Sequence, residues 1–181
     1  AKGLLITTIG VLVLSPDALL VRLIDIDRWN LLVYRGLITG VGLTFILYLL
    51  HRKATLRQFR SIGREGLWVS LLFTITSISF VSALYFTSVA NTLIIISSSP
   101  MFAALYSRLL LKEKIQLRAI VTMIVVIGAI AYIVADGVGG GSLKGDAMAI
   151  LCSMSMAGVF TVTRRARASN MVPATAISGI L

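Results

Sequence analysis

The sequence is poor in the residues that soluble proteins and metal sites depend on. Only 13% of its 181 residues are charged, against roughly 25% in soluble domains. It has one cysteine, Cys152, and one histidine, His51. A single cysteine excludes a disulfide scaffold, and together the two residues provide no zinc ligand set. We therefore expect no metal or other cofactor, and the low charge also excludes a disordered polycation.

Hydrophobic residues make up 57% of the chain, and 17 Lys and Arg against 7 Asp and Glu leave a net charge of +10. This combination predicts an all-α polytopic membrane protein whose positive charges lie outside the bilayer. A helix needs about 20 apolar residues to cross the hydrocarbon. Such runs occur at residues 3–23, 31–50, 67–89, 92–111, 117–135 and 146–163, and a seventh opens at Met171.

Basic residues gather in alternate loops between these spans. One set of loops carries Arg52, Lys53, Arg57, Arg60, Arg64, Arg108, Lys112, Lys114, Arg118, Arg164, Arg165 and Arg167, and the other set carries only Arg28 and Lys144. Short loops rich in Lys and Arg stay in the cytoplasm. The pattern predicts a multi-pass protein of the cell membrane, most simply a bacterial inner membrane, with a cytoplasmic N-terminus. Because bilayer spans separate the basic clusters, they form no continuous face for nucleic acid.

Three charged residues fall inside the predicted spans, where ionisable groups are costly and mark functional sites. Asp17, Arg22 and Arg35 all lie in the outer half of the membrane. Asp17 is too short to reach the headgroups, so we expect it in a polar cavity, paired with either Arg22 or Arg35. Both arginines could instead extend to the interface. Pro16 predicts a kink in the first span.

Hydroxyl and small residues mark spans two to four. Thr74 and Ser77 are near neighbours in the third span, and the fourth contains the run Ser97–Pro100, with Ser98 near its centre. Proline weakens a helix, and weakened helices at the midplane are where secondary transporters bind substrate. Packing between helices is the alternative interpretation for the hydroxyls. Gly36 and Gly40 form a small-xxx-small pair, for which we expect a packing role.

No residue pattern points to catalysis. Asp17 has no second carboxylate in its span, and His51 lies at the edge of a basic loop. The glycine-rich residues 137–141 lack the Gly-Lys-Ser/Thr ending of a phosphate-binding loop. We therefore do not expect an enzyme.

The order of these features resembles the EamA-type domain of the drug/metabolite transporter superfamily. The resemblance rests on an Ala-rich joint at residues 83–90, Pro100 with the small and aromatic residues up to Ala104, Glu113, Gly128, Asp136-Gly137, and Lys144-Gly145-Asp146. Such proteins usually have ten spans in two five-helix repeats of opposite orientation. The resemblance implies a first repeat over residues 1–136, an outer linker over 137–145 and the start of a second repeat over 146–181. The chain begins at Ala1 and its seventh run is still open at Leu181, so we expect a fragment of a longer protein.

The resemblance implies a secondary-active transporter of small metabolites or drug-like solutes, working as an exporter or exchanger. Its partners would be the lipid bilayer, a small-molecule substrate, and a coupling proton or an exchanged solute. Asp17, Arg22 and Arg35 are the candidates for the outer part of the pathway, and Thr74, Ser77, Ser98 and Pro100 for its midplane. The alternative is a structural or regulatory membrane subunit that transports nothing itself, or a half-transporter that acts only as a dimer.

Overall fold

The computed structural model of this chain describes residues 3, 8, 10, 12, 16–23, 26–51, 63–112, 117–136, 142–166 and 172–180. These residues form helices and turns, with no strand among them. The helices are α2 (Asp17–Leu23), α3 (Arg28–His51), α5 (Gly63–Phe86), α6 (Val89–Ile96), α7 (Ser99–Leu111), α8 (Leu117–Asp136), α9 (Leu143–Arg165) and α10 (Val172–Ser178). Most of the predicted first span before Pro16, Glu113 and residues 137–141 lie outside the described part.

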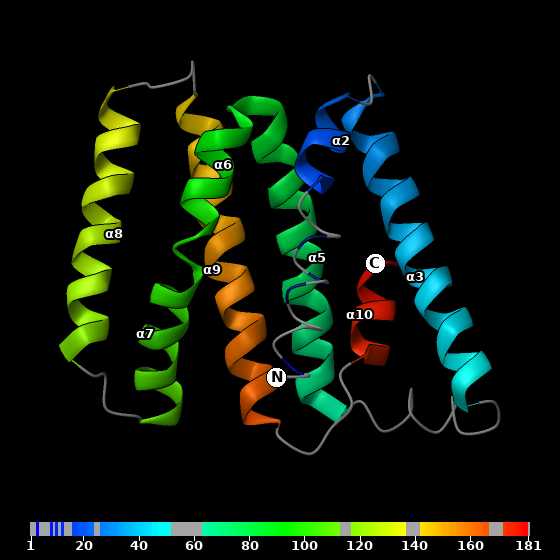
Figure 1. Cartoon of the computed structure of the whole chain (residues 1–181). Coiled ribbons are helices and arrows are strands. Elements are labelled where there is room, and N and C mark those ends of the chain that lie inside the picture. The colour runs from blue at the N-terminus through cyan, green and yellow to red at the C-terminus, as the bar shows by residue number, and fades with distance from the viewer. Residues whose placement is uncertain are drawn as a thin grey trace.

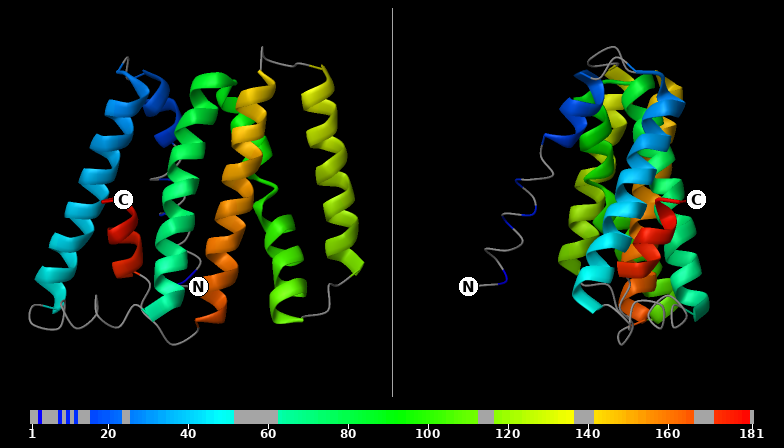
Figure 2. Two further views of the ribbon diagram at one scale, coloured as in Figure 1. Left: turned by 180° about the vertical axis from the view of Figure 1, so that it is seen from behind. Right: turned by 90° about the vertical axis from the view of Figure 1, so that its right-hand side faces the viewer.

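Helices α3, α5, α8 and α9 run side by side between the same two ends of the molecule, and the shorter helices α2, α6, α7 and α10 each cover part of that length (Figures 1 and 2). Helices α5 and α9 lie in the middle, α6, α7 and α8 on one side of them, and α2, α10 and α3 on the other. Four segments are long and apolar enough to cross a membrane: Arg28–Leu49, Gly63–Phe86, Val89–Leu111 and Leu143–Arg165. A shorter apolar helix covers Ala119–Tyr132. The described chain is therefore an all-helical, multi-pass membrane protein, as the sequence predicts.

Apolar side chains cover the outside of the bundle. Val33, Ile38 and Phe45 on α3 and Ile124 and Val125 on α8 are each more than half exposed. A surface of this kind would favour aggregation in water, whereas lipid tails solvate it. The hydrophobic effect therefore adds little between these helices, and close packing of small residues must hold them together.

Small residues allow α5 and α9 to pack closely. Ala83 of α5 and Ala149 of α9 are fully buried with Ile95 of α6. Near the end of α5, a Cβ added to Gly145 would lie 2.6 Å from the Thr87 Cβ and 2.7 Å from the Thr87 backbone nitrogen. Only glycine fits at position 145 of α9 without moving the chain after α5.

The α5–α9 contact also explains two differences from the predicted spans. Helix α9 begins at Leu143 and not at Asp146, because the Ser142 hydroxyl caps it by accepting a hydrogen bond from the Gly145 N–H. The same hydroxyl donates to the Phe86 carbonyl at 2.8 Å. Helix α5 ends at Phe86, earlier than residue 89, because the chain turns there to enter α6.

Asp146 lies inside the protein and not in an exposed loop. The residue is only 6% exposed and lies in the first turn of α9. Its carboxylate accepts a hydrogen bond of 3.0 Å from the hydroxyl of Thr87, itself 4% exposed. The N-terminal end of a helix also stabilises a nearby negative charge. This pair joins α9 to the turn between α5 and α6.

Gly36 and Gly40 of α3 lie against the chain at the end of α10. A Cβ at Gly36 would lie 2.6 Å from the Gly179 backbone oxygen. At Gly40 it would lie 2.9 Å from Ile180 Cγ1 and 3.1 Å from the Ala176 oxygen. The small-xxx-small pair therefore lies at a close helix contact, where backbone atoms leave no room for a side chain.

Replacing Gly36 by alanine tests this contact. We expect G36A to lower the free energy of unfolding by about 1–3 kcal/mol, the usual cost of overpacking. The matched control is G42A on the same helix, where an added Cβ has nothing within 4 Å. This control should be neutral or slightly stabilising, since alanine favours helix over glycine. Thermal unfolding in detergent measures both variants, and equal stabilities would contradict the close contact.

Candidate functional site

The fourth predicted span is broken in the middle. The sequence predicts one helix over residues 92–111, whereas the structure has α6, a turn at Ser97 and Ser98, and then α7 (Figure 1). Pro100 occupies the first turn of α7. Because proline has no N–H, the Ile96 carbonyl loses the partner that a continuous helix would give it. The break thus lies where the sequence predicts a weakened helix.

Three consecutive serines place their hydroxyls on the carbonyls at the break, and the Ile95 carbonyl also accepts the Ser98 N–H at 3.1 Å. Each hydroxyl donates to the carbonyl three residues earlier: Ser97 to Ile94, Ser98 to Ile95 and Ser99 to Ile96, each at 2.6 Å. An unpaired carbonyl in lipid costs several kcal/mol. The triple serine therefore makes the break tolerable inside a membrane.

Ser153 of α9 completes this cluster, and the sequence analysis missed it. Its side chain is fully buried, with its Oγ 2.9 Å from the Ser98 Oγ and 3.2 Å from the Ser99 Oγ. The available signal was the pair of hydroxyls at Ser153 and Ser155 near the middle of an apolar span. A single serine there is common in membrane helices, so only the fold identifies its partner.

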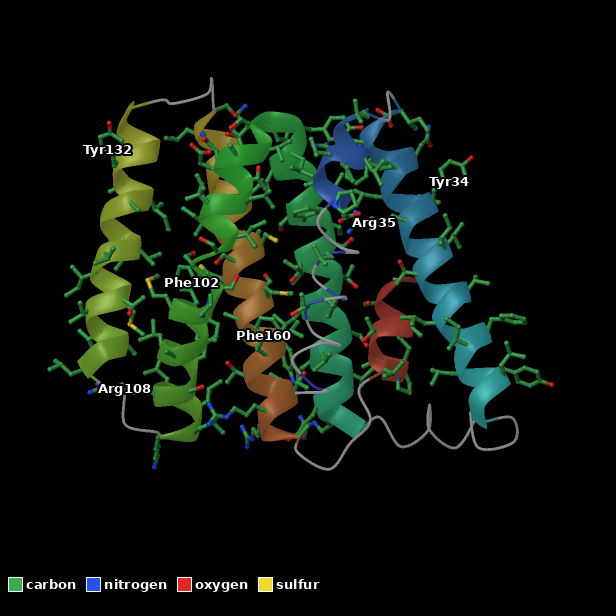
Figure 3. All side chains as sticks on the ribbon, viewed as in Figure 1. Tyr34, Arg35, Phe102, Arg108, Tyr132 and Phe160 are labelled. Atoms are coloured by element: carbon green, nitrogen blue, oxygen red, sulfur yellow. The ribbon has the colours of Figure 1, made fainter. Side chains whose placement is uncertain are left out.

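A cavity of about 250 Å³ lies between the break and α8. Its lining comes from Ser97, Ser98, Pro100, Met101 and Ala104 on one side and from Ala119, Thr122, Met123 and Val126 of α8 on the other. These side chains are apolar or carry a neutral hydroxyl, and none is charged. Arg108, the basic residue of α7, lies near the end of that helix away from the break (Figure 3). The lining therefore has the size for a small solute and offers no charged side chain that could pair with it.

Asp17 and Arg35 form an ion pair on the other side of the bundle. The Arg35 Nη1 donates to Asp17 Oδ1 at 2.9 Å, and its Nη2 donates to Oδ2 at 2.7 Å. The two side chains are 36% and 32% exposed, and the guanidinium carbon lies 5.5 Å from the centre of the Phe80 ring. Figure 3 places Arg35 beside α2 and in the half of α3 nearer the α2–α3 turn. Of the two partners considered for Asp17, the structure brings Arg35 into contact.

The other residues of the first span are less fully placed. Pro16 directly precedes α2, and its carbonyl accepts a hydrogen bond of 2.9 Å from the Leu20 N–H. A kink at Pro16 would involve preceding residues that lie outside the described part. Arg22 lies in α2, and its side chain is likewise not described.

Thr74 and Ser77 line a different cavity from Ser98 and Pro100. Their cavity, of about 300 Å³, lies between α3, α5 and the end of α10. The Thr74 hydroxyl is near two carbonyls, that of Ser70 at 3.0 Å and that of Ser178 at 3.2 Å. The structure therefore does not bring the four predicted midplane residues together. Helical spacing along one span cannot show which neighbour each face meets.

These features define a class: a multi-pass helical membrane protein with a broken span beside a neutral cavity. A sequence model described as the EamA-like transporter family matches residues 2–135. The chain belongs to this family, which confirms the resemblance seen in the sequence. It is therefore a membrane transporter protein for small solutes, with the lipid bilayer and a small-molecule substrate as partners. The family consists of transporters and not enzymes, in agreement with the expectation above. Comparisons with curated proteins and with solved structures gave no match.

Proposed function

We propose that this chain is part of a secondary-active transporter that binds its solute in the cavity beside the α6–α7 break. The observation that carries the proposal is the broken span itself, with Ser97, Ser98 and Pro100 facing a cavity of about 250 Å³. Secondary transporters commonly bind substrate near the midplane, at discontinuous helices. The volume is at the lower limit of ligand pockets, which favours a small metabolite over a large drug.

Charge at the two ends supports a cytoplasmic N-terminus in a cell membrane, most simply a bacterial inner membrane. The end with the start of α5 and the ends of α7 and α9 carries Arg64, Arg108, Lys112, Arg164 and Arg165. The opposite end, among the described residues, has Arg22, Arg28 and Lys144 as its basic residues, with Asp27, Asp136 and Asp146 as acidic ones. Lys and Arg near span ends are retained in the cytoplasm.

The family match ends at residue 135, next to the end of α8 at Asp136. We propose that this unit is a first five-helix repeat and that α9 and α10 begin a second. A repeat with an odd number of spans places its second copy in inverted orientation, as in many transporters. A half-transporter working as a dimer is the alternative arrangement of the same unit.

The Asp17–Arg35 pair is our candidate for energy coupling in an exporter or exchanger. Both carboxylate oxygens accept an N–H from Arg35, so a proton on Asp17 would remove one of the two acceptors. Protonation would weaken the link between α2 and α3. An outward-facing ion pair that opens and closes with proton occupancy can connect a gradient to a change of conformation.

Filling the cavity tests the proposed solute site. We expect A104F to reduce solute transport in proteoliposomes by about tenfold, because the phenyl ring would occupy space that the solute needs; a tenfold change corresponds to about 1.4 kcal/mol of binding free energy. The matched control is L109F on the same helix, at a side chain that is 67% exposed and outside the cavity. Normal transport by A104F with native folding would contradict the site. A wild-type chain that moves no solute would favour the non-transporting alternative.

Neutralising Asp17 tests the coupling proposal. We expect D17N to abolish uptake driven by a proton gradient and to leave solute counterflow, which needs no net proton movement. The asparagine keeps the shape of the side chain while removing its charge. The measurement compares gradient-driven uptake with counterflow in the same vesicles. Unchanged dependence of uptake on the proton gradient would rule out Asp17 as the coupling residue.

A further inference from the structure

The hydroxyl protons at the break are already used, so the cluster presents mainly acceptors. Ser98 and Ser99 each have one proton, and each donates it to a backbone carbonyl at 2.6 Å. Because these carbonyl contacts are shorter than the contacts with Ser153, at 2.9 Å for Ser98 and 3.2 Å for Ser99, we assign Ser153 as the donor, most directly to Ser98. Ser97 likewise donates its proton to Ile94. What Ser97 and Ser98 offer to the cavity is lone pairs on oxygen.

The start of α7 is a poor anion site for a related reason. Half-helix N-termini usually attract anions because their first N–H groups have no partner. Here Pro100 has no N–H, and the N–H groups of Met101 and Phe102 both reach the Ser98 carbonyl, at 2.9 and 3.4 Å. Of the first turn, the Ser99 N–H is the one with no hydrogen bond to the part of the chain that the structure describes. A carboxylate at the break would therefore find one backbone donor.

The helix dipoles do not change this excess of hydrogen-bond acceptors over donors at the break. The carbonyl end of α6 and the N–H end of α7 meet at the same break, so their partial charges of opposite sign largely cancel. The local hydrogen-bonding groups then decide which ligand is favoured. Serine oxygens accept and the cavity lining holds no cationic side chain to neutralise an anion. Burying an unpaired ion of either sign is costly, but a carboxylate would in addition face oxygen lone pairs instead of donors.

We propose that this cavity binds the ammonium group of a small alkylamine and discriminates against carboxylates. The inference rests on the proposed function and adds the chemical class of its solute. An ammonium carries N–H donors and no acceptor, which matches oxygens whose protons are committed elsewhere. Met101, Met123 and Ala104 provide polarisable and apolar surface for a short alkyl chain. The volume of about 250 Å³ limits the solute to a small molecule.

Three probes of matched size test the charge preference on the full chain in detergent. They are n-butylamine, which is protonated at pH 7 as a lysine side chain is, the neutral butyramide, and butyrate. We expect butylammonium to bind at least about tenfold more tightly than butyrate in calorimetric titration, because the ammonium brings N–H donors to serine oxygens whose protons are committed, whereas the carboxylate brings only acceptors. Butyramide, which carries both a donor and an acceptor, should bind with an affinity between the two. Tighter or equal binding of butyrate would overturn the inference, as would no binding of butylammonium.

A pair of variants locates the binding at the break. M123K places a tethered ammonium in the cavity and should remove butylammonium binding, whereas M123Q, of similar length and uncharged, should keep part of it. Equal losses in the two variants would contradict a charge-selective site. If M123K does not fold, the wild-type probe comparison still decides. If A104F abolishes transport but butyrate is the probe that binds, the preference for an ammonium group is wrong and the proposed solute site stands. If A104F transports normally, the proposed solute site itself is wrong.

Discussion

The requirement that every backbone polar group in lipid has a partner governs this structure. A span can break inside the bilayer only if other groups take over the carbonyls that lose their helical bonds. Pro100 leaves the Ile96 carbonyl without its usual donor, and the Ser99 hydroxyl replaces it at 2.6 Å. Ser97 and Ser98 donate to the two preceding carbonyls, and that of Ile95 also accepts the Ser98 N–H. The triple serine is thus what allows a break between α6 and α7, and the adjoining cavity depends on it.

The rest of the described bundle supports that break. Helix α9 supplies Ser153, whose position depends on the close α5–α9 contact, and that contact depends on small residues such as Gly145. Thr87 and Asp146 join the beginning of α9 to the turn between α5 and α6. The Thr87–Asp146 contact therefore fixes the start of α6 at one end of the broken span, and Ser153 fixes the turn between α6 and α7 at its middle. On the other side, the Asp17–Arg35 pair connects α2 to α3 in a separate part of the pathway.

Composition, hydrophobic runs and loop charges were sufficient to predict an all-helical membrane protein and the places of most spans. The family was predicted from a resemblance, carried by short motifs such as Pro100 to Ala104, and the match over residues 2–135 confirms it. Pro100 and the serines before it also predicted a weakened fourth span, because proline and hydroxyl effects on a helix are local. Tertiary contacts were less accessible. Ser153 lies 54 positions along the chain from Ser99, and Asp146 resembles a loop charge until Thr87 is placed against it. Thr74 and Ser98 were expected in one cavity, whereas their helices face different neighbours.

The central claim is that the interruption at Ser97–Ser98 forms the solute site, and P100A tests it most directly. Alanine restores an N–H that can bond to the Ile96 carbonyl, so it favours a continuous helix by up to about 3 kcal/mol. Solute transport by P100A in proteoliposomes, measured beside its expression and thermal stability, is the decisive comparison. We predict that P100A has native or raised stability and loses transport at least about tenfold. A tenfold change corresponds to about 1.4 kcal/mol of free energy. Full transport at native expression would contradict the central claim and leave Pro100 a role in packing alone.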